Sequence, residues 1–133
     1  MYNWETSLTV TNCTFTNNSA ASGGGMYNNT CNPSVTNCIL WNDSPDEIAE
    51  ILGSATVTFS NVQGGWTGTG NIDADPMFAD ADGRLLPGSP CVDAGDNDAV
   101  PVDILTDLDG NRRVADGDHS GSEDIDIGAY EVQ

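Results

Sequence analysis

The chain contains an internal repeat of 22 to 25 residues. The tripeptide Met1-Tyr2-Asn3 recurs as Met26-Tyr27-Asn28. The same offset of 25 residues relates four further pairs: Val10 and Val35, Asn12 and Asn37, Cys13 and Cys38, and Phe15 and Leu40. A third copy follows at an offset of 22, with Ile48, Val57 and Val62 in the places of Met26, Val35 and Leu40. Repeats of this length indicate a protein in which each repeat is one structural unit stacked on the next.

Each repeat has the composition of short strands. Three brief apolar stretches are separated by Asn, Gly, Ser and Pro, and in the second copy they lie at 26–27, 34–35 and 39–40. This spacing favours strands joined by turns over amphipathic helices. We therefore predict an all-β fold in which about four coils of 22–25 residues stack as a parallel β-helix.

Two asparagines are predicted to form equivalent corners of the coils. Val10 and Phe15 need the same inward direction although they are five positions apart. Successive residues of a strand point to opposite faces, so an odd offset would place them on opposite faces. A left-handed corner at Asn12 corrects the phase, because asparagine tolerates that conformation. Asn37 would form the same corner in the next coil. The predicted inward rows are Val10–Val35–Val57 and Phe15–Leu40–Val62.

The segment 45–52 has two possible interpretations. Ser44 and Pro45 suit the cap and first residue of a short helix. The repeat favours a strand instead, because Ile48 takes the place of Met26 and a β-rich stretch follows at 55–58. Ile72 lies 24 residues beyond Ile48 and predicts a fourth, irregular coil running through 75–78.

The charge of the chain limits its possible partners. Its 21 acidic residues face three arginines and no lysine, which gives a net charge of -18. Such a surface repels nucleic acid and anionic membrane, so neither is an expected partner, and divalent cations are the natural counter-ions. No apolar run is long enough for membrane insertion. Only five carboxylates precede residue 71, so charge-dependent chemistry is expected near the C-terminus.

The repeat divides the chain into two parts of one structural domain. Residues 1–82 are predicted to form the coils. Residues 83–133, here called the C-terminal segment, are rich in Asp, Gly and Pro, and we expect them to form an irregular acidic cap over the open end of the stack, where unpaired strand edges would otherwise recruit another chain. Because Met1 is in register with the internal Met26, we also expect the chain to be a piece of a longer protein.

Seven motifs carry a resemblance to a known family. In order, they are Gly23–Asn28, Val35–Cys38, Val62–Gly65, Asn71–Pro76, Pro87–Gly95, Thr106–Asn111 and Asp126–Glu131. Together they resemble the C-terminal region of large bacterial secreted right-handed parallel β-helix proteins with polymorphic outer-membrane-protein-like repeats or a choice-of-anchor domain. The resemblance covers nearly the whole chain. It implies a right-handed β-helix and an extracellular or cell-surface location, but no particular activity.

One acidic stretch has the spacing of a calcium-binding loop. Asp116, Asp118, Ser120 and Asp124 stand at positions 1, 3, 5 and 9, with Gly121 at position 6. Position 12 is Ile127, where a calcium loop has a bidentate glutamate, so other oxygen donors would be needed. The candidates for that role are Asp107, Asp109 and Asp126. Asp and Gly are also ordinary turn residues, but carboxylates packed this densely without lysine favour a calcium ion between them.

Other polar groups have simpler interpretations. Asp73, Asp75, Asp80 and Asp82 lie beside turn-forming proline and glycine, which favours turns over a metal site. We expect the arginines to pair with carboxylates of the C-terminal segment, and we expect the single histidine to be solvated. These residues are Arg84, Arg112, Arg113 and His119.

The cysteines leave two alternatives open. Their spacing contains no C-x-x-C pair, so a zinc site is not expected. Cys13 and Cys38 should be neighbours in adjacent coils, where they form either a disulfide or a row of buried thiols. Four N-glycosylation sequons also occur, and asparagine-rich repeats generate such sequons by chance. They begin at Asn12, Asn17, Asn28 and Asn42.

These observations favour a non-catalytic module of the cell surface or extracellular space: a spacer, an adhesin stalk or a surface-layer element, stabilised by calcium. Its expected partners are neighbouring coils of the same or an identical chain, and surface glycans. One alternative is a subunit of a filament built by head-to-tail stacking. The other is a carbohydrate-binding or polysaccharide-degrading protein; aromatic residues would form its sugar-binding strip. Catalysis is not expected, because the coils lack lysine and arginine. The aromatic residues are Trp4, Tyr27, Trp41 and Trp66.

Overall fold

The computed structural model describes residues 1–133 and is all-β, with one short 3-10 helix, η1 (Asn97–Ala99). Nine strands of the repeats form three parallel three-stranded sheets, and two later strands form an antiparallel pair. The helical content includes nothing long and apolar enough to cross a membrane. The sheets are β1 (Tyr2–Trp4), β4 (Met26–Asn29) and β7 (Ile48–Ile51); β2 (Thr9–Thr11), β5 (Ser34–Thr36) and β8 (Thr56–Thr58); and β3 (Thr14–Thr16), β6 (Ile39–Trp41) and β9 (Asn61–Val62), with β10 (Val114–Ala115) and β11 (Asp124–Ile125) as the antiparallel pair.

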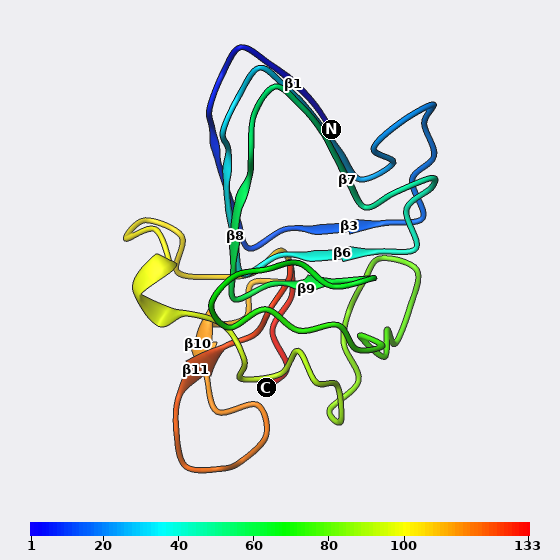
Figure 1. The fold of residues 1–133 in the computed structure, drawn as a ribbon. Helices are drawn as coiled ribbons and strands as arrows, with labels where there is room; N and C mark the ends of the chain where they lie inside the picture. The colour runs from blue at the N-terminus through cyan, green and yellow to red at the C-terminus, as the bar shows by residue number, and fades with distance from the viewer.

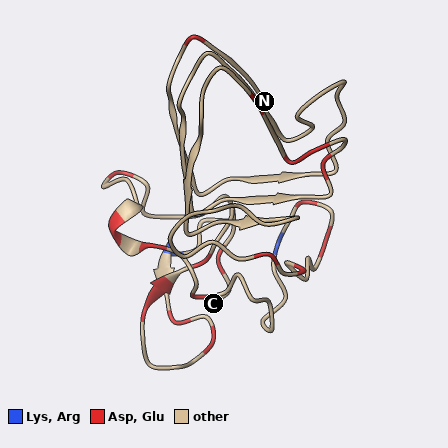
Figure 2. Ribbon diagram, viewed as in Figure 1, with Lys and Arg blue, Asp and Glu red and all other residues tan.

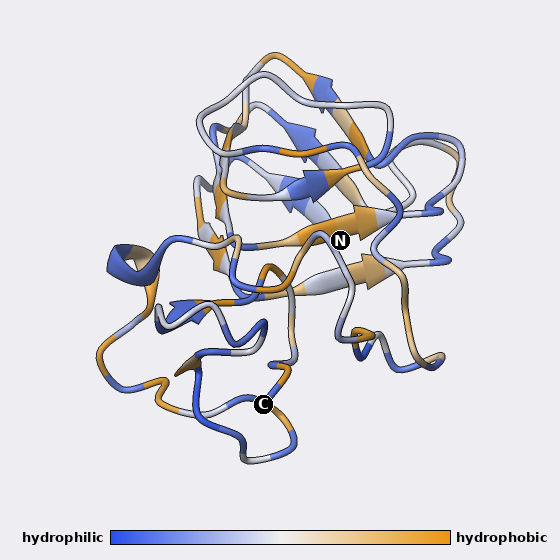
Figure 3. Cartoon of the chain, turned by 90° about the horizontal axis from the view of Figure 1, so that it is seen from below, coloured by the Kyte–Doolittle hydropathy of each residue, from blue (hydrophilic) through white to orange (hydrophobic).

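The strands pair in the register that the repeat predicts. Successive repeats follow nearly the same path in Figure 1, and Figure 3 shows their strands one above another. Both inward rows are confirmed: Val35 pairs with Val10 and Val57, and Leu40 pairs with Phe15 and Val62. Ile48 begins strand β7 opposite Met26, which confirms the strand interpretation of 45–52.

The corners also match the prediction. Asn12 and Asn37 have φ values of 54° and 53°, in the left-handed region. Val10, Val35 and Leu40 consequently enter one buried apolar cluster. The third repeat makes its corner at Phe59, with φ 45°, a conformation that is costly for a bulky residue. Two hydrogen bonds hold this corner: the backbone N–H of Phe59 donates to the Thr69 carbonyl, and the N–H of Ser60 donates to the Asn71 side-chain oxygen.

The loop 64–72 lies against the end of the third repeat, where the sequence had suggested the C-terminal segment. The Asn71 amide nitrogen donates to the Val57 carbonyl at 2.9 Å, and its oxygen accepts from the Ser60 N–H at 3.0 Å. Ile72 forms a parallel bridge with Asn61, and not with Ile48 as its offset had predicted. The loop thereby occupies backbone groups at the edges of β8 and β9.

The C-terminal segment instead packs against the outer side of the β3–β6–β9 sheet (Figure 1). Ile39 faces outward there and is fully buried in a second apolar cluster with Leu85, Cys91 and Ile127. Two hydrogen bonds also hold the C-terminal segment to this surface. The Gly128 N–H donates to the Asn37 carbonyl, and the Ala129 N–H donates to the Thr14 hydroxyl. An apolar residue on the outward face of β6 explains why this side, rather than the end of the stack, receives the segment.

Candidate metal centre in the C-terminal segment

Three aspartates converge at one point of the C-terminal segment. One carboxylate oxygen each from Asp93, Asp116 and Asp118 lies within 4.8 Å of the other two. Asp116 directly follows strand β10, and Asp93 comes from the turns that precede η1. The calcium-loop spacing therefore identified two of the three residues, while Asp93 comes from a distant part of the sequence.

Backbone amides hold these carboxylates in place. The N–H groups of Gly117 and Asp118 donate to Asp93 at 3.3 and 2.8 Å, and Ser120 N–H donates to Asp118 Oδ1 at 2.8 Å. Gly121 N–H donates to Asp116 Oδ2 at 3.1 Å, whereas Asp116 Oδ1 is buried and has no hydrogen-bond partner. A buried carboxylate oxygen without a partner is costly, so it is a natural ligand for a cation.

The electrostatics of the cluster also favour a cation. Burial raises the pKa of Asp93, the backbone N–H groups of Asp118 and Gly117 lower it, and the side chain of Asp118 raises it. The pKa of Asp118 is lowered, chiefly by its hydrogen bonds with Ser120. The three arginines form ion pairs with other carboxylates, so none neutralises the cluster. The three carboxylates could supply part of the six to eight oxygen ligands that a calcium ion takes.

Ser120 and Asp124 do not join Asp93, although the sequence placed them in the loop. Ser120 supports Asp118 through its backbone N–H. Asp124 turns toward η1, where its carboxylate accepts from the Asn97 amide at 2.9 Å and from the Ser122 hydroxyl at 2.7 Å. The predicted role of Asp124 as a ligand of this cluster is therefore not supported by its position.

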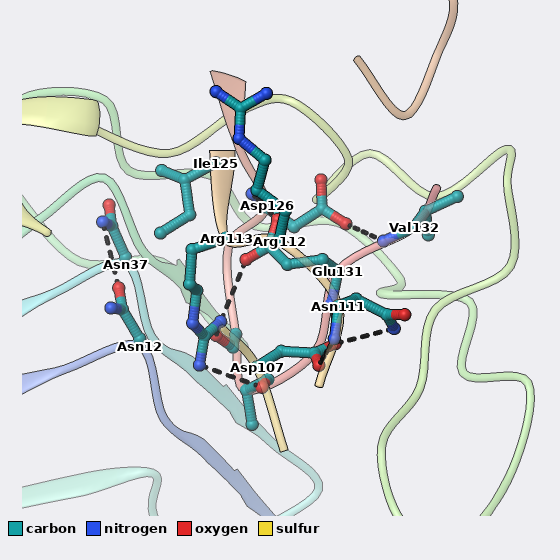
Figure 4. Close-up of polar contacts among 12 residues, drawn as sticks. Asn12, Asn37, Asp107, Asn111, Arg112, Arg113, Ile125, Asp126, Glu131 and Val132 are labelled. Carbon is teal, nitrogen blue, oxygen red and sulfur yellow. Dashed lines mark hydrogen bonds and ion pairs between the residues drawn. The ribbon is translucent and has the colours of Figure 1, made fainter. Parts of the chain in front are cut away.

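The three supplementary donors have other functions. Asp107 accepts hydrogen bonds from the N–H groups of Asp109, Asn111 and Glu131, and so organises a tight turn. Asp126 is buried and accepts from the N–H groups of Asp93 and Val132 at 2.8 and 2.7 Å. Figure 4 shows the contacts from Asp107 to Asn111 and from Asp126 to Val132.

Asp109 pairs with Arg84, as expected from the prediction that the arginines pair with carboxylates of the C-terminal segment. Arg84 also binds Asp80 and Asp82, and its guanidinium lies 4.6 Å from the centre of the Tyr130 ring. Arg112 pairs with Glu123 at 2.9 Å. Figure 2 shows most acidic residues on the loops that surround these arginines, while the strands carry few. The prediction that arginines brace the C-terminal segment is confirmed.

The chain matches no family model, and no curated protein or solved structure matches it. Its function must therefore be inferred from the geometry of its own residues.

The remaining candidate residues do not form a common site. His119 is exposed, and one ring nitrogen lies 3.2 Å from the Asp116 carbonyl. All four cysteines are free thiols, and Cys38 is buried in the core. Its thiol lowers the pKa of the partly exposed Cys13 to about 7. Of the four sequon asparagines, Asn12 and Asn28 are buried, so only Asn17 and Asn42 are exposed enough for a glycan.

The aromatic residues do not form one strip. Trp66 packs against the inner core, and Trp41 packs against the cluster beneath the C-terminal segment. Tyr27 stacks on Tyr2 with ring centres 5.4 Å apart. Only Trp4 is largely exposed among the four predicted residues. Packing explains most of these side chains better than sugar binding does.

Proposed function

We propose that the chain is a non-catalytic structural module of a secreted or cell-surface protein, with the fold of a right-handed parallel β-helix of about four coils. The observation that carries this proposal is the continuous row of Val10, Val35 and Val57, which pair in register through three repeats. Parallel connections between neighbouring strands are right-handed in nearly all proteins. The sequence resemblance to bacterial secreted β-helix proteins supports the same location and role.

Calcium is the second part of the proposal. Asp93, Asp116 and Asp118 would bind the ion, with the unpartnered Asp116 Oδ1 as one ligand. The bound ion would neutralise the repulsion among these carboxylates and tie the turn near Asp93 to the loop after β10. Calcium at extracellular concentrations would then stabilise the C-terminal segment against the side of the stack.

A spacer or stalk is favoured over a filament built by head-to-tail stacking. A second copy added to the third repeat would need the free backbone groups of β8 and β9. The Asn71 side chain and Ile72 already bond to these strands. Stacking of another chain would therefore have to displace the loop 64–72.

Two experiments test the proposed function. The purified chain is incubated with neutral and acidic polysaccharides, and we expect no new reducing ends or unsaturated products. An antibody against the chain should label intact source cells or their culture medium. Turnover abolished by changing one carboxylate would overturn the non-catalytic role, and labelling only after lysis would overturn the location.

A further inference from the structure

Two carboxyl groups are buried together on the turn between β6 and β7. The exposed fractions of Asp43 and Glu47 are 7% and 9%. Both line a cleft of about 310 Å³, together with Gln63 and Trp66 from the loop after β9. This pair lies in the repeats, away from the aspartates of the candidate metal centre.

The hydrogen bonds of Asp43 leave one of its oxygens without a partner. Asn18, in the first repeat, donates to Asp43 Oδ1 from its backbone and side-chain nitrogens at 2.7 and 2.8 Å. The backbone N–H of Asp43 donates to Glu47 at 3.2 Å. Asp43 Oδ2 is buried, with no donor from any N–H or hydroxyl. The Glu47 carboxyl group is adjacent to Asp43, because both of its oxygens lie near the Asp43 N–H, at 3.2 and 3.4 Å, and both side chains line the same cleft.

No cationic side chain compensates this pair. The turn and β7 add Asp46 and Glu50, while the loop after β9 is bonded to Asp73 through Gly64. The loop 17–25 carries no ionisable side chain, and the amino group of Met1 is bonded to the Gly25 carbonyl. Every arginine is in the C-terminal segment and is paired with other carboxylates. Two adjacent buried carboxylates without a cation cannot both remain ionised at low cost.

We propose that Asp43 and Glu47 share one proton, and that the Glu47 carboxyl group donates it to Asp43 Oδ2. The shared proton supplies the missing donor and leaves a single negative charge, which the two Asn18 bonds stabilise. It thus forms a latch between the first repeat and the turn that leads into the third. The proposal is independent of calcium binding and of the proposed cell-surface role.

The latch makes the stack dependent on pH. Burial, and then the hydrogen bond with Asp43, raise the pKa of Glu47 from 4.5 to about 7. Between about pH 4.5 and pH 7 the folded chain therefore holds a proton that the unfolded chain has released. The stabilisation is complete below about pH 4.5 and is lost as the pH rises through about 7. Above that pH two adjacent negative charges repel each other and oppose the contact with Asn18.

Glu47→Gln tests the proposal, because glutamine keeps a donor for Asp43 but cannot ionise. The unfolding equilibrium constants of wild type and variant are compared at about pH 5 and about pH 8. The ratio of wild type to variant should be at least about tenfold larger at the higher pH. The matched control is Asp46→Asn on the same turn, since Asp46 is exposed. That change should leave the pH dependence as in wild type.

A second measurement needs no variant. In the ¹³C-labelled wild-type protein, the carboxyl resonance of Glu47 should titrate near pH 7. Titration of Glu47 near 4.5, or an unfolding difference that stays constant with pH, would overturn the shared proton. A divalent cation could also stabilise the protein in a way that Glu47→Gln abolishes and Asp118→Asn preserves. That result would overturn the proposal too, because the pair would then be a metal site.

Discussion

Arg113 and Glu131 form the most deeply buried ion pair of the chain. Arg113 Nη1 lies 2.9 Å from Glu131 Oε1, and the two side chains are only 6% and 1% exposed. The guanidinium also donates to the carbonyls of Gly128 and Ala129 at 3.2 and 3.0 Å. Burial raises the pKa of Glu131, whereas its hydrogen bonds with the Asp126 N–H and with Arg113 lower it. The pair therefore fixes residues 128–131 to the residue that precedes β10.

Arg113→Met should strongly destabilise the protein. It leaves Glu131 buried without its cation and removes the donors of two carbonyls, so the free energy of unfolding should fall by about 3–5 kcal/mol. Urea unfolding measures the change. Arg112→Met is the matched control, because the pair of Arg112 with Glu123 is mostly exposed and such pairs contribute about 0–1 kcal/mol. Equal losses in the two variants would contradict a special role for the buried pair.

Val35→Asp tests the stack itself. Val35 is fully buried between Val10 and Val57, so the variant places an unpaired charge in the core and should not fold. Circular dichroism and thermal melting report the outcome. Ser34→Asp is the control, because Ser34 is exposed on the same strand and should tolerate the charge. A folded Val35→Asp protein with an unchanged melting temperature would show that this row is not the core.

The repeat explains why the strands could be predicted and the C-terminal segment could not. An offset of 25 residues fixes the partners of Val10 and Asn12 directly, since equivalent residues of stacked units lie side by side. No such rule applies to Asp93, whose carboxylate meets Asp118 only because irregular turns bring distant segments together. The sequence offers sixteen acidic residues after residue 70 and nothing that singles out this one.

The partner of Ile72 was mispredicted for a related reason. Ile72 has the offset expected for a fourth strand beside Ile48, but it bridges Asn61 instead. The glycine-rich loop before it folds back over the third repeat, where Asn71 supplies hydrogen bonds that no periodic pattern encodes. Likewise, the burial of Ile39 on an outward face depends on a partner from the C-terminal segment.

Asn37→Ala should cost more than Asn17→Ala, although both residues have left-handed φ values, 53° and 57°. Alanine is strained at either site by about 1 kcal/mol. The Asn37 side chain also donates to Asn12 and to the Asp96 carbonyl and accepts from the Asp96 N–H, whereas the Asn17 side chain bonds only to Thr16. Figure 4 shows the contact of Asn37 with Asn12. The lost buried bonds should add about 1–3 kcal/mol. Urea unfolding should show this difference; its absence would mean that the corner requires only the backbone conformation.

Calcium should stabilise the protein through Asp93, Asp116 and Asp118. A ligand that binds only the folded state adds RT ln(1 + [L]/Kd) to the free energy of unfolding, about 2.7 kcal/mol at a hundredfold excess over Kd. The melting temperature should therefore rise with millimolar calcium and fall with chelator. Magnesium should substitute poorly, because it demands a tighter octahedral arrangement of ligands.

Two variants locate the calcium effect. Asp118→Asn should blunt the response by removing one charge from the cluster. Asp124→Asn should preserve it, because Asp124 faces Asn97 and Ser122 instead. This pair distinguishes the three-aspartate cluster from a continuous calcium loop, in which Asp124 would be a ligand. A melting curve that neither calcium nor chelator moves would mean that the turns and hydrogen bonds around Asp93 hold the segment without a metal ion.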